Sequence, residues 1–132
     1  MTEPNREAGR PAANAELAVE RLSDDETLRN GLEDDAFGPL LEFASYLAIA
    51  RSNSFPTTDA LYVALRSLVK AAVRAANRQG TDDLIAAIAP FAAPTGSEGV
   101  ARKLARLNSD ATENARLIVD TLEAITGVNI EH

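Results

Sequence analysis

The sequence predicts an all-α protein, a small bundle of about five to seven helices behind a flexible N-terminal arm. Apolar residues make up 45% of its 132 residues, aromatic residues make up only 5%, and alanine supplies much of the apolar share. This composition favours closely packed helices over a sheet. Apolar side chains also recur every three or four residues, as on one face of a helix, and no stretch alternates as a strand would.

The chain is long enough to form one domain with its own core. Residues 1–12 include two prolines and a glycine but no periodic apolar positions, so they are predicted to form the arm. Residues 13–128 are predicted to form a single helical domain, and residues 129–132 a short C-terminal tail.

Two short helices are predicted after the arm. The first covers residues 13–22. Ser23 is expected to cap the second, because Glu26 three residues later completes a capping box. Gly31 is expected to end it.

The next predicted helix begins at Asp34 or Asp35 and runs to about residue 51. Pro39 is expected in its first turn, where the N–H groups have no partner within the helix. The helix is apolar nearly all round, which predicts a place in the middle of a bundle or at a subunit interface. The residues predicted for such an interface are Leu40, Phe43, Tyr46, Leu47 and Ile49.

Residues 51–58 are predicted to form a loop, with Thr58 capping the clearest helix of the chain, residues 59–78. Gly80 is expected to provide a left-handed cap at its end. The helix carries an apolar seam with spacings of four and three residues, made of Leu61, Leu65, Leu68, Ala72 and Ala75.

Three helices are predicted in the last third of the chain. Thr81 caps the first, which Pro90 disturbs, and its apolar face is Leu84, Ile85, Ile88 and Phe91. Thr95 and Glu98 form a capping box for the second, which ends near Leu107. The third runs from Ser109 or Asp110 to Thr126 and is closed by Gly127, with a seam made of Ala111, Ala115, Ile118, Leu122 and Ile125.

Charge is unevenly distributed along the chain, whose net charge is −7. Residues 1–50 are strongly acidic, residues 51–106 are basic, and residues 107–132 are acidic again. The net charge disfavours general nucleic-acid binding. The separate blocks can attract each other within the fold or between subunits.

Composition also excludes several kinds of site. Without cysteine the chain forms no disulfide and no thiolate–metal site. The longest apolar run, residues 40–50, is too short to span a bilayer, and the N-terminal residues lack the apolar core of a secretory signal. We therefore expect a cytoplasmic protein that contacts no membrane and carries no cofactor or metal.

Three Asp-Asp pairs, at residues 24–25, 34–35 and 82–83, raise the question of a metal site. Registers that start at Asp24, Asp25 or Asp34 do not fit a calcium-binding loop, because they place Leu28, Arg29 or Gly38 at loop position five, where an oxygen ligand is needed. Each pair stands at the start of a predicted helix, where carboxylates bond free N–H groups. The pairs are therefore predicted to cap helices.

Catalytic residues are scarce, so the chain is predicted not to be an enzyme. The single histidine is His132, the last residue, which disfavours histidine-based catalysis. Glu42 is the one carboxylate inside a strongly apolar stretch, and it is expected to reach the surface or pair with an arginine. Residues 95–103 lack the Gly-Lys-Ser/Thr ending and the preceding strand of a phosphate loop.

Four cations at four-residue intervals are the most distinctive feature of the sequence. On the helix of residues 59–78 they cover an arc of about 120°, opposite the apolar seam. Two interpretations stay open: a solvated face, which is the commoner role, or a docking strip for an anionic partner. The acidic residues 16–35 of the same or a neighbouring chain are the expected binding partner of such a strip. The candidate binding residues are Arg66, Lys70, Arg74 and Arg78, extended by Arg102, Lys103 and Arg106 if their helix lies alongside.

These observations predict a non-enzymatic helical module that binds another protein or a second copy of itself, so that a homo-oligomer is one expected form. The alternative is an anionic-ligand or nucleic-acid binder that uses the basic row, although a nucleic-acid partner is disfavoured. An enzyme that works through carboxylates such as Glu42 is a more remote third hypothesis.

Overall fold

The computed structural model describes residues 11–92 and 100–128. Within these ranges the chain forms α-helices and short 3-10 helices and no strand, which confirms the predicted all-α bundle. The α-helices are α2 (Pro11–Ser23), α3 (Glu26–Arg29), α4 (Asp34–Arg51), α5 (Thr58–Ala76), α6 (Asp82–Ile88), α7 (Val100–Leu104) and α8 (Ala111–Thr126). The 3-10 helices are η1 (Ser52–Ser54) and η2 (Ala89–Phe91).

The predicted arm and tail lie largely outside the described residues. Helix α2 begins at Pro11, within the range predicted as arm, and proline fits the first position of a helix because its N–H is not needed there. The predicted capping pair Thr95 and Glu98 also lies outside the described residues.

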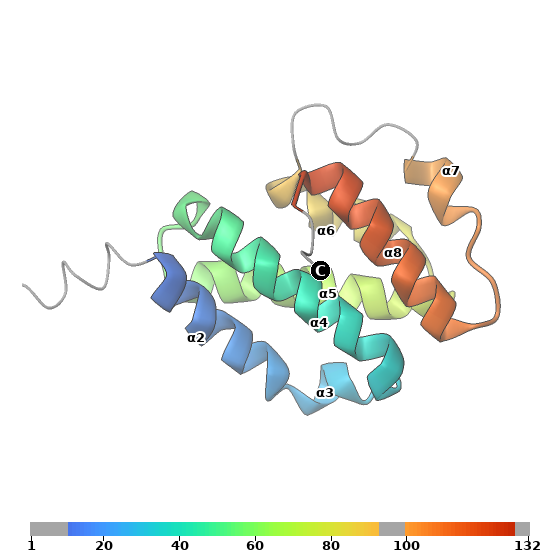
Figure 1. Ribbon diagram of the computed structural model, residues 1–132, viewed down its shortest axis with the longest axis horizontal. Coiled ribbons are helices and arrows are strands. Elements are labelled where there is room, and N and C mark those ends of the chain that lie inside the picture. Colours follow the sequence, from blue (N-terminus) through green and yellow to red (C-terminus); the bar gives the residue numbers. More distant parts are fainter. Residues whose placement is uncertain (1–10, 93–99, 129–132) are drawn as a thin grey trace, which may run out of the picture.

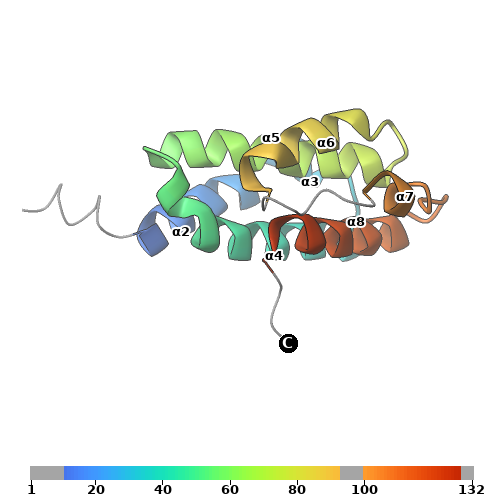
Figure 2. The ribbon, with the colours of Figure 1, turned by 90° about the horizontal axis from the view of Figure 1, so that it is seen from above.

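The helices form two layers, and α5 packs against helices of both. Figure 2 shows α5 and α6 on one side and α4 and α8 on the other, while Figure 1 shows α2 beside α4 at one edge of the bundle. Helix α5 packs against α2, α4, α6 and α8, and α7 packs against α8. None of the described helices is both long and apolar enough to cross a lipid bilayer.

The predicted seams form the centre of the core. All five apolar residues predicted for the seam of α5 are buried, as are four of the five predicted for α8, Ala111 being half-buried. Burial of each leucine or isoleucine stabilises the fold by roughly 1.5–3 kcal/mol. In α6, Leu84 and Ile88 are buried but Ile85 is exposed. The buried apolar face of α6 is therefore narrower than predicted.

Helix α4 occupies the middle of the bundle, the first of the two places predicted for an apolar helix. It contacts α2, α5 and α8. Leu40, Phe43 and Leu47 are buried in the core of their own chain, so they have no surface to offer a partner. Of the predicted interface residues, only the half-buried Tyr46 and the exposed Ile49 reach the surface.

Two predicted caps are displaced by one or two residues. Ser23 is the last residue of α2, and its hydroxyl donates to the carbonyl of Glu20, so it does not cap α3. Asp25 caps α3 instead and accepts the N–H of Leu28 at 3.2 Å. Thr57, rather than Thr58, caps α5 and accepts the N–H of Ala60 at 3.0 Å. The difference arises because the cap must have extended backbone, which Asp25 and Thr57 adopt.

Helix α4 begins at Asp34, one of the two predicted starts, but this start places Pro39 in the second turn and not in the first turn as predicted. The carbonyl of Glu33 accepts the N–H groups of Ala36 and Phe37 and thereby closes the first turn earlier. Because proline has no N–H, Pro39 removes one helical hydrogen bond, the one to the carbonyl of Asp35. Asp35 lies on the exposed side of the helix.

The end of α5 is closed by Arg78 and not by Gly80 as predicted. Arg78 has a φ of 59°, its N–H donates to the carbonyl of Ala75 at 3.0 Å, and the N–H of Gln79 donates to the carbonyl of Arg74 at 2.8 Å. These two bonds are those of a Schellman motif, in which the residue after the cap is left-handed. The end of α8 follows the prediction, since Asp110 caps its start and Gly127 (φ 75°) its end.

Candidate docking groove

The four cations of the basic row differ in their surroundings. Lys70, Arg74 and Arg78 are exposed, as expected for the face of α5 opposite its seam, whereas Arg66 is only about one-third exposed. Lys70 forms no ion pair with any carboxylate of the described residues. The row therefore contains one half-buried cation and three exposed ones.

Arg66 is occupied by the acidic segment of its own chain. Its Nε donates to Oδ2 of Asp25 at 2.8 Å, and the Asp25 side chain is only 13% exposed. The hydrogen bond from Arg66 is the main reason that the pKa of Asp25 lies below its usual value, and burial opposes it. The same hydrogen bond raises the pKa of Arg66. Arg66 thus links α5 to α3 and is not free to bind a partner.

A second link between these parts of the chain was not anticipated from the sequence. Nη1 of Arg21 donates to Oδ1 of Asp59 at 2.6 Å, and the guanidinium carbon of Arg21 lies 4.0 Å from the ring centroid of Tyr62. This ion pair and cation–π contact connect α2 to the first turns of α5. No local pattern signals the pair, because its members are 38 residues apart.

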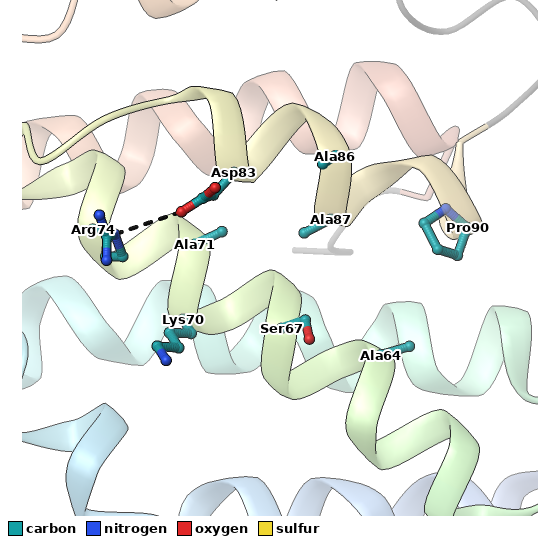
Figure 3. Close-up of a pocket in the computed structure, with 9 residues that line it drawn as sticks. All are labelled: Ala64, Ser67, Lys70, Ala71, Arg74, Asp83, Ala86, Ala87 and Pro90. Atoms are coloured by element: carbon teal, nitrogen blue, oxygen red, sulfur yellow. Dashed lines mark ion pairs between the residues drawn. The ribbon is translucent and has the colours of Figure 1, made fainter.

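Lys70 and Arg74 border an open groove between α5 and α6, with a volume of about 480 Å³. Four alanines from the two helices line its floor: Ala64, Ala71, Ala86 and Ala87. Figure 3 shows these alanines between the two helices, with Arg74 and Asp83 facing each other at one end and Pro90 at the other. Nε of Arg74 lies 3.8 Å from Oδ2 of Asp83. The groove combines an apolar floor of small side chains with a charged border.

The proposed extension of the row does not join this groove. Arg102 and Arg106 are exposed and Lys103 is half-buried. Helix α7, which carries Arg102 and Lys103, packs against α8. Figure 1 shows α7 separated from α5. The condition that their helix lies alongside α5 is therefore not met.

A second hollow, of about 260 Å³, lies between α2 and α4. Val19 and Ile49 contribute its apolar surface, and Glu16 and Glu20 border it. Ile49, one of the predicted interface residues, therefore faces an acidic edge of the bundle.

The carboxylates singled out in the sequence lie apart from one another in the part of the chain that the structure describes. Glu42 is exposed, as expected for a side chain that reaches the surface. Asp82 and Asp83 lie in the first turn of α6, where they face the positive end of its dipole. Within residues 11–92 and 100–128, no three histidine or acidic side chains lie close enough together to hold a metal ion.

Comparison with known proteins identifies no relative: no protein-family model matches the chain, and neither a curated protein nor a solved structure is significantly similar to it.

Proposed function

We propose that this protein is a non-enzymatic interaction module whose α5–α6 groove binds an acidic helical segment of a partner. The observation that carries the proposal is the groove itself, with alanines on its floor and the positive charges of Lys70 and Arg74 at its border.

The small floor residues suit a helix as the partner. Alanine projects one methyl group, so the backbone of a docking helix can approach α5 and α6 closely and bury its own larger apolar side chains between them. This is the helix-in-groove mode of recognition, in which anchors at intervals of three and four residues fill an apolar channel.

The border charges favour an acidic partner over a neutral one. Lys70 has no carboxylate partner among the described residues, and Arg74 is paired with Asp83 only at 3.8 Å. Both side chains can therefore turn to carboxylates of a docked helix. Such exposed contacts contribute mainly to orientation and association rate.

Nucleic-acid or other polyanion binding is the weaker proposal. Arg66 is engaged by Asp25 at 2.8 Å, so the row is interrupted at its first cation. A continuous phosphate-binding row would need all four to be open.

The proposal is tested by titrating the ¹⁵N-labelled protein with a synthetic amphipathic helix that carries leucine along one face and glutamate elsewhere. We expect amide shifts to concentrate at Ala64, Ala71, Ala86 and Ala87. The same peptide with lysine in place of glutamate is the matched control, and a single-stranded oligonucleotide tests the polyanion alternative.

Shifts at the groove with the glutamate peptide and much weaker shifts with the lysine peptide support the proposal. Equal responses to both peptides, or shifts away from α5 and α6, contradict it. Tighter binding of the oligonucleotide, with an affinity that falls steeply with salt, would replace it by the polyanion alternative.

A further inference from the structure

Helix α2 exposes an apolar side chain among carboxylates. Leu17 is 47% exposed, and Glu16 and Glu20, one residue before it and three after, are exposed as well. Leu22 and Ala18 hold the opposite side of α2 in the core. The outer side of α2 is therefore an acidic helical ridge with one leucine anchor, the kind of segment that the α5–α6 groove suits.

We propose that the groove binds α2 of a second copy of this chain, with Leu17 on the alanine floor and Glu16 and Glu20 beside Lys70 and Arg74. The inference rests on the proposed function and names its partner. A ridge that enters a groove is the ordinary geometry of helix packing. Glu16 and Glu20 are opposite in charge to Lys70 and Arg74, so these two pairs favour the contact, although Asp83 also lines the groove.

The two surfaces belong to different parts of the same molecule. In Figure 1, α2 forms the lower left edge of the bundle and α6 lies towards its upper side, and Figure 2 places α6 at the outside of the α5 layer. One copy can therefore offer α2 to one neighbour and its groove to another. A contact between two different surfaces of the chain forms a twofold dimer where two copies engage reciprocally, and rings or open chains where they do not.

The net charge of −7 on each copy opposes association and makes the contact weak and concentration-dependent. This allows a sharp test by light scattering and sedimentation from about 1 μM to about 1 mM. We expect the average mass of the wild-type protein to rise with concentration. Reversal of either surface, by Glu16→Lys with Glu20→Lys or by Lys70→Glu with Arg74→Glu, should leave monomers.

Matched controls separate the local contact from net charge. Glu42→Lys with Asp120→Lys makes the net charge more positive by the same amount as the α2 reversal. Arg102→Glu with Arg106→Glu makes it more negative by the same amount as the groove reversal. All four control side chains are exposed, and both control proteins should associate as the wild type does. Leu17→Ser, an uncharged change at an exposed position, should also abolish association. Thermal melting verifies that each variant is folded.

The decisive variant combines both reversals in one chain, so that its net charge equals that of the wild type and the charges of the contact are exchanged. We expect it to associate again. A wild-type protein that stays monomeric throughout, or a folded combined variant that stays monomeric, overturns the inference. If the glutamate peptide still binds the groove of a monomeric wild type, only this inference fails; if it does not bind, the proposed function fails as well.

Discussion

One carboxylate, that of Asp25, both caps α3 and holds Arg66 of α5. Its Oδ1 accepts the N–H of Leu28 at 3.2 Å, and its Oδ2 accepts Nε of Arg66 at 2.8 Å. The acidic N-terminal block thus neutralises the first cation of the basic row and leaves Lys70, Arg74 and Arg78 exposed. Intramolecular pairing therefore decides which part of the row is available to a partner.

Replacement of Asp25 should separate these two roles. Asparagine caps helices as well as aspartate but cannot form an ion pair with a guanidinium, so Asp25→Asn should lower the free energy of unfolding by about 0.5–1 kcal/mol. Asp25→Ala removes the cap as well and should cost about 1–3 kcal/mol. Urea denaturation measures both values. Asp24→Ala, at the exposed neighbour, is the control, and an equal loss for Asp24→Ala would contradict the assignment.

The contribution of Asp25 should also depend on pH in a defined direction. Its pKa is lowered in the folded protein from the ordinary value of 3.8. A carboxyl with a lowered folded pKa stabilises the fold fully above its unfolded pKa and loses this contribution as the pH falls through the folded pKa. The difference in unfolding free energy between wild type and Asp25→Asn should therefore be constant from pH 7 to about pH 5 and shrink below about pH 4. Urea denaturation across this range measures it, and a difference that grows towards low pH would be inconsistent with the pairing.

Gly31 should not tolerate a side chain. A Cβ at this position would lie 2.5 Å from Cγ1 of Val73, so Gly31→Ala should lower the free energy of unfolding by about 1–3 kcal/mol. Val73→Ala in the same chain should recover part of the loss. At Gly38 a Cβ meets nothing within 4 Å, and the gain in helix propensity is opposed by Pro39 after it, so Gly38→Ala should change stability by less than about 0.5 kcal/mol. Equal effects at the two glycines would refute the close approach.

Replacement of Arg78 by glycine should stabilise the protein. Its φ of 59° belongs to the left-handed region, which costs an ordinary residue roughly 1–2 kcal/mol, although glycine also gains entropy when unfolded. Arg78→Gly should therefore raise the free energy of unfolding by about 0.5–1 kcal/mol, measured by thermal melting. Arg78→Lys controls for the guanidinium, and Gln79→Gly for the glycine itself. A melting temperature that falls in Arg78→Gly as in Gln79→Gly would show that the left-handed turn is absent.

The sequence predicted the helices and their buried seams because both depend on local periodicity, as Leu61, Leu65 and Leu68 illustrate. It misplaced the caps of α3 and α5 because each start offers more than one residue able to cap, Ser23 and Asp25 at α3 and Thr57 and Thr58 at α5, and only the backbone conformation distinguishes them. It predicted the exposed face of Lys70 and Arg74 from helix geometry.

The site itself required tertiary structure. The groove appears only when α6 lies beside α5 and brings Ala86 and Ala87 opposite Ala64 and Ala71, and no pattern along the chain indicates that pairing. The sequence indicates residues 16–35 as the binding partner of the basic row, but the contact of Arg66 with Asp25 depends on how α3 is placed. The link between Arg21 and Asp59 is equally nonlocal.

The central claim is that the positive border of the α5–α6 groove selects an acidic helix. Its most direct test is calorimetric measurement of the affinity of the glutamate peptide for the wild type, for Lys70→Glu with Arg74→Glu, and for Arg102→Glu with Arg106→Glu. In the groove variant, the two attractive contacts of the peptide's glutamates with Lys70 and Arg74 become repulsive, which costs on the order of 1.4 kcal/mol or more of binding free energy. We therefore predict that the affinity of the peptide falls about tenfold or more for this variant. The α7 variant, which has the same net charge, should bind within about threefold of the wild type. Equal losses in the two variants would contradict the claim, because they would show that the peptide responds to overall charge and not to this groove.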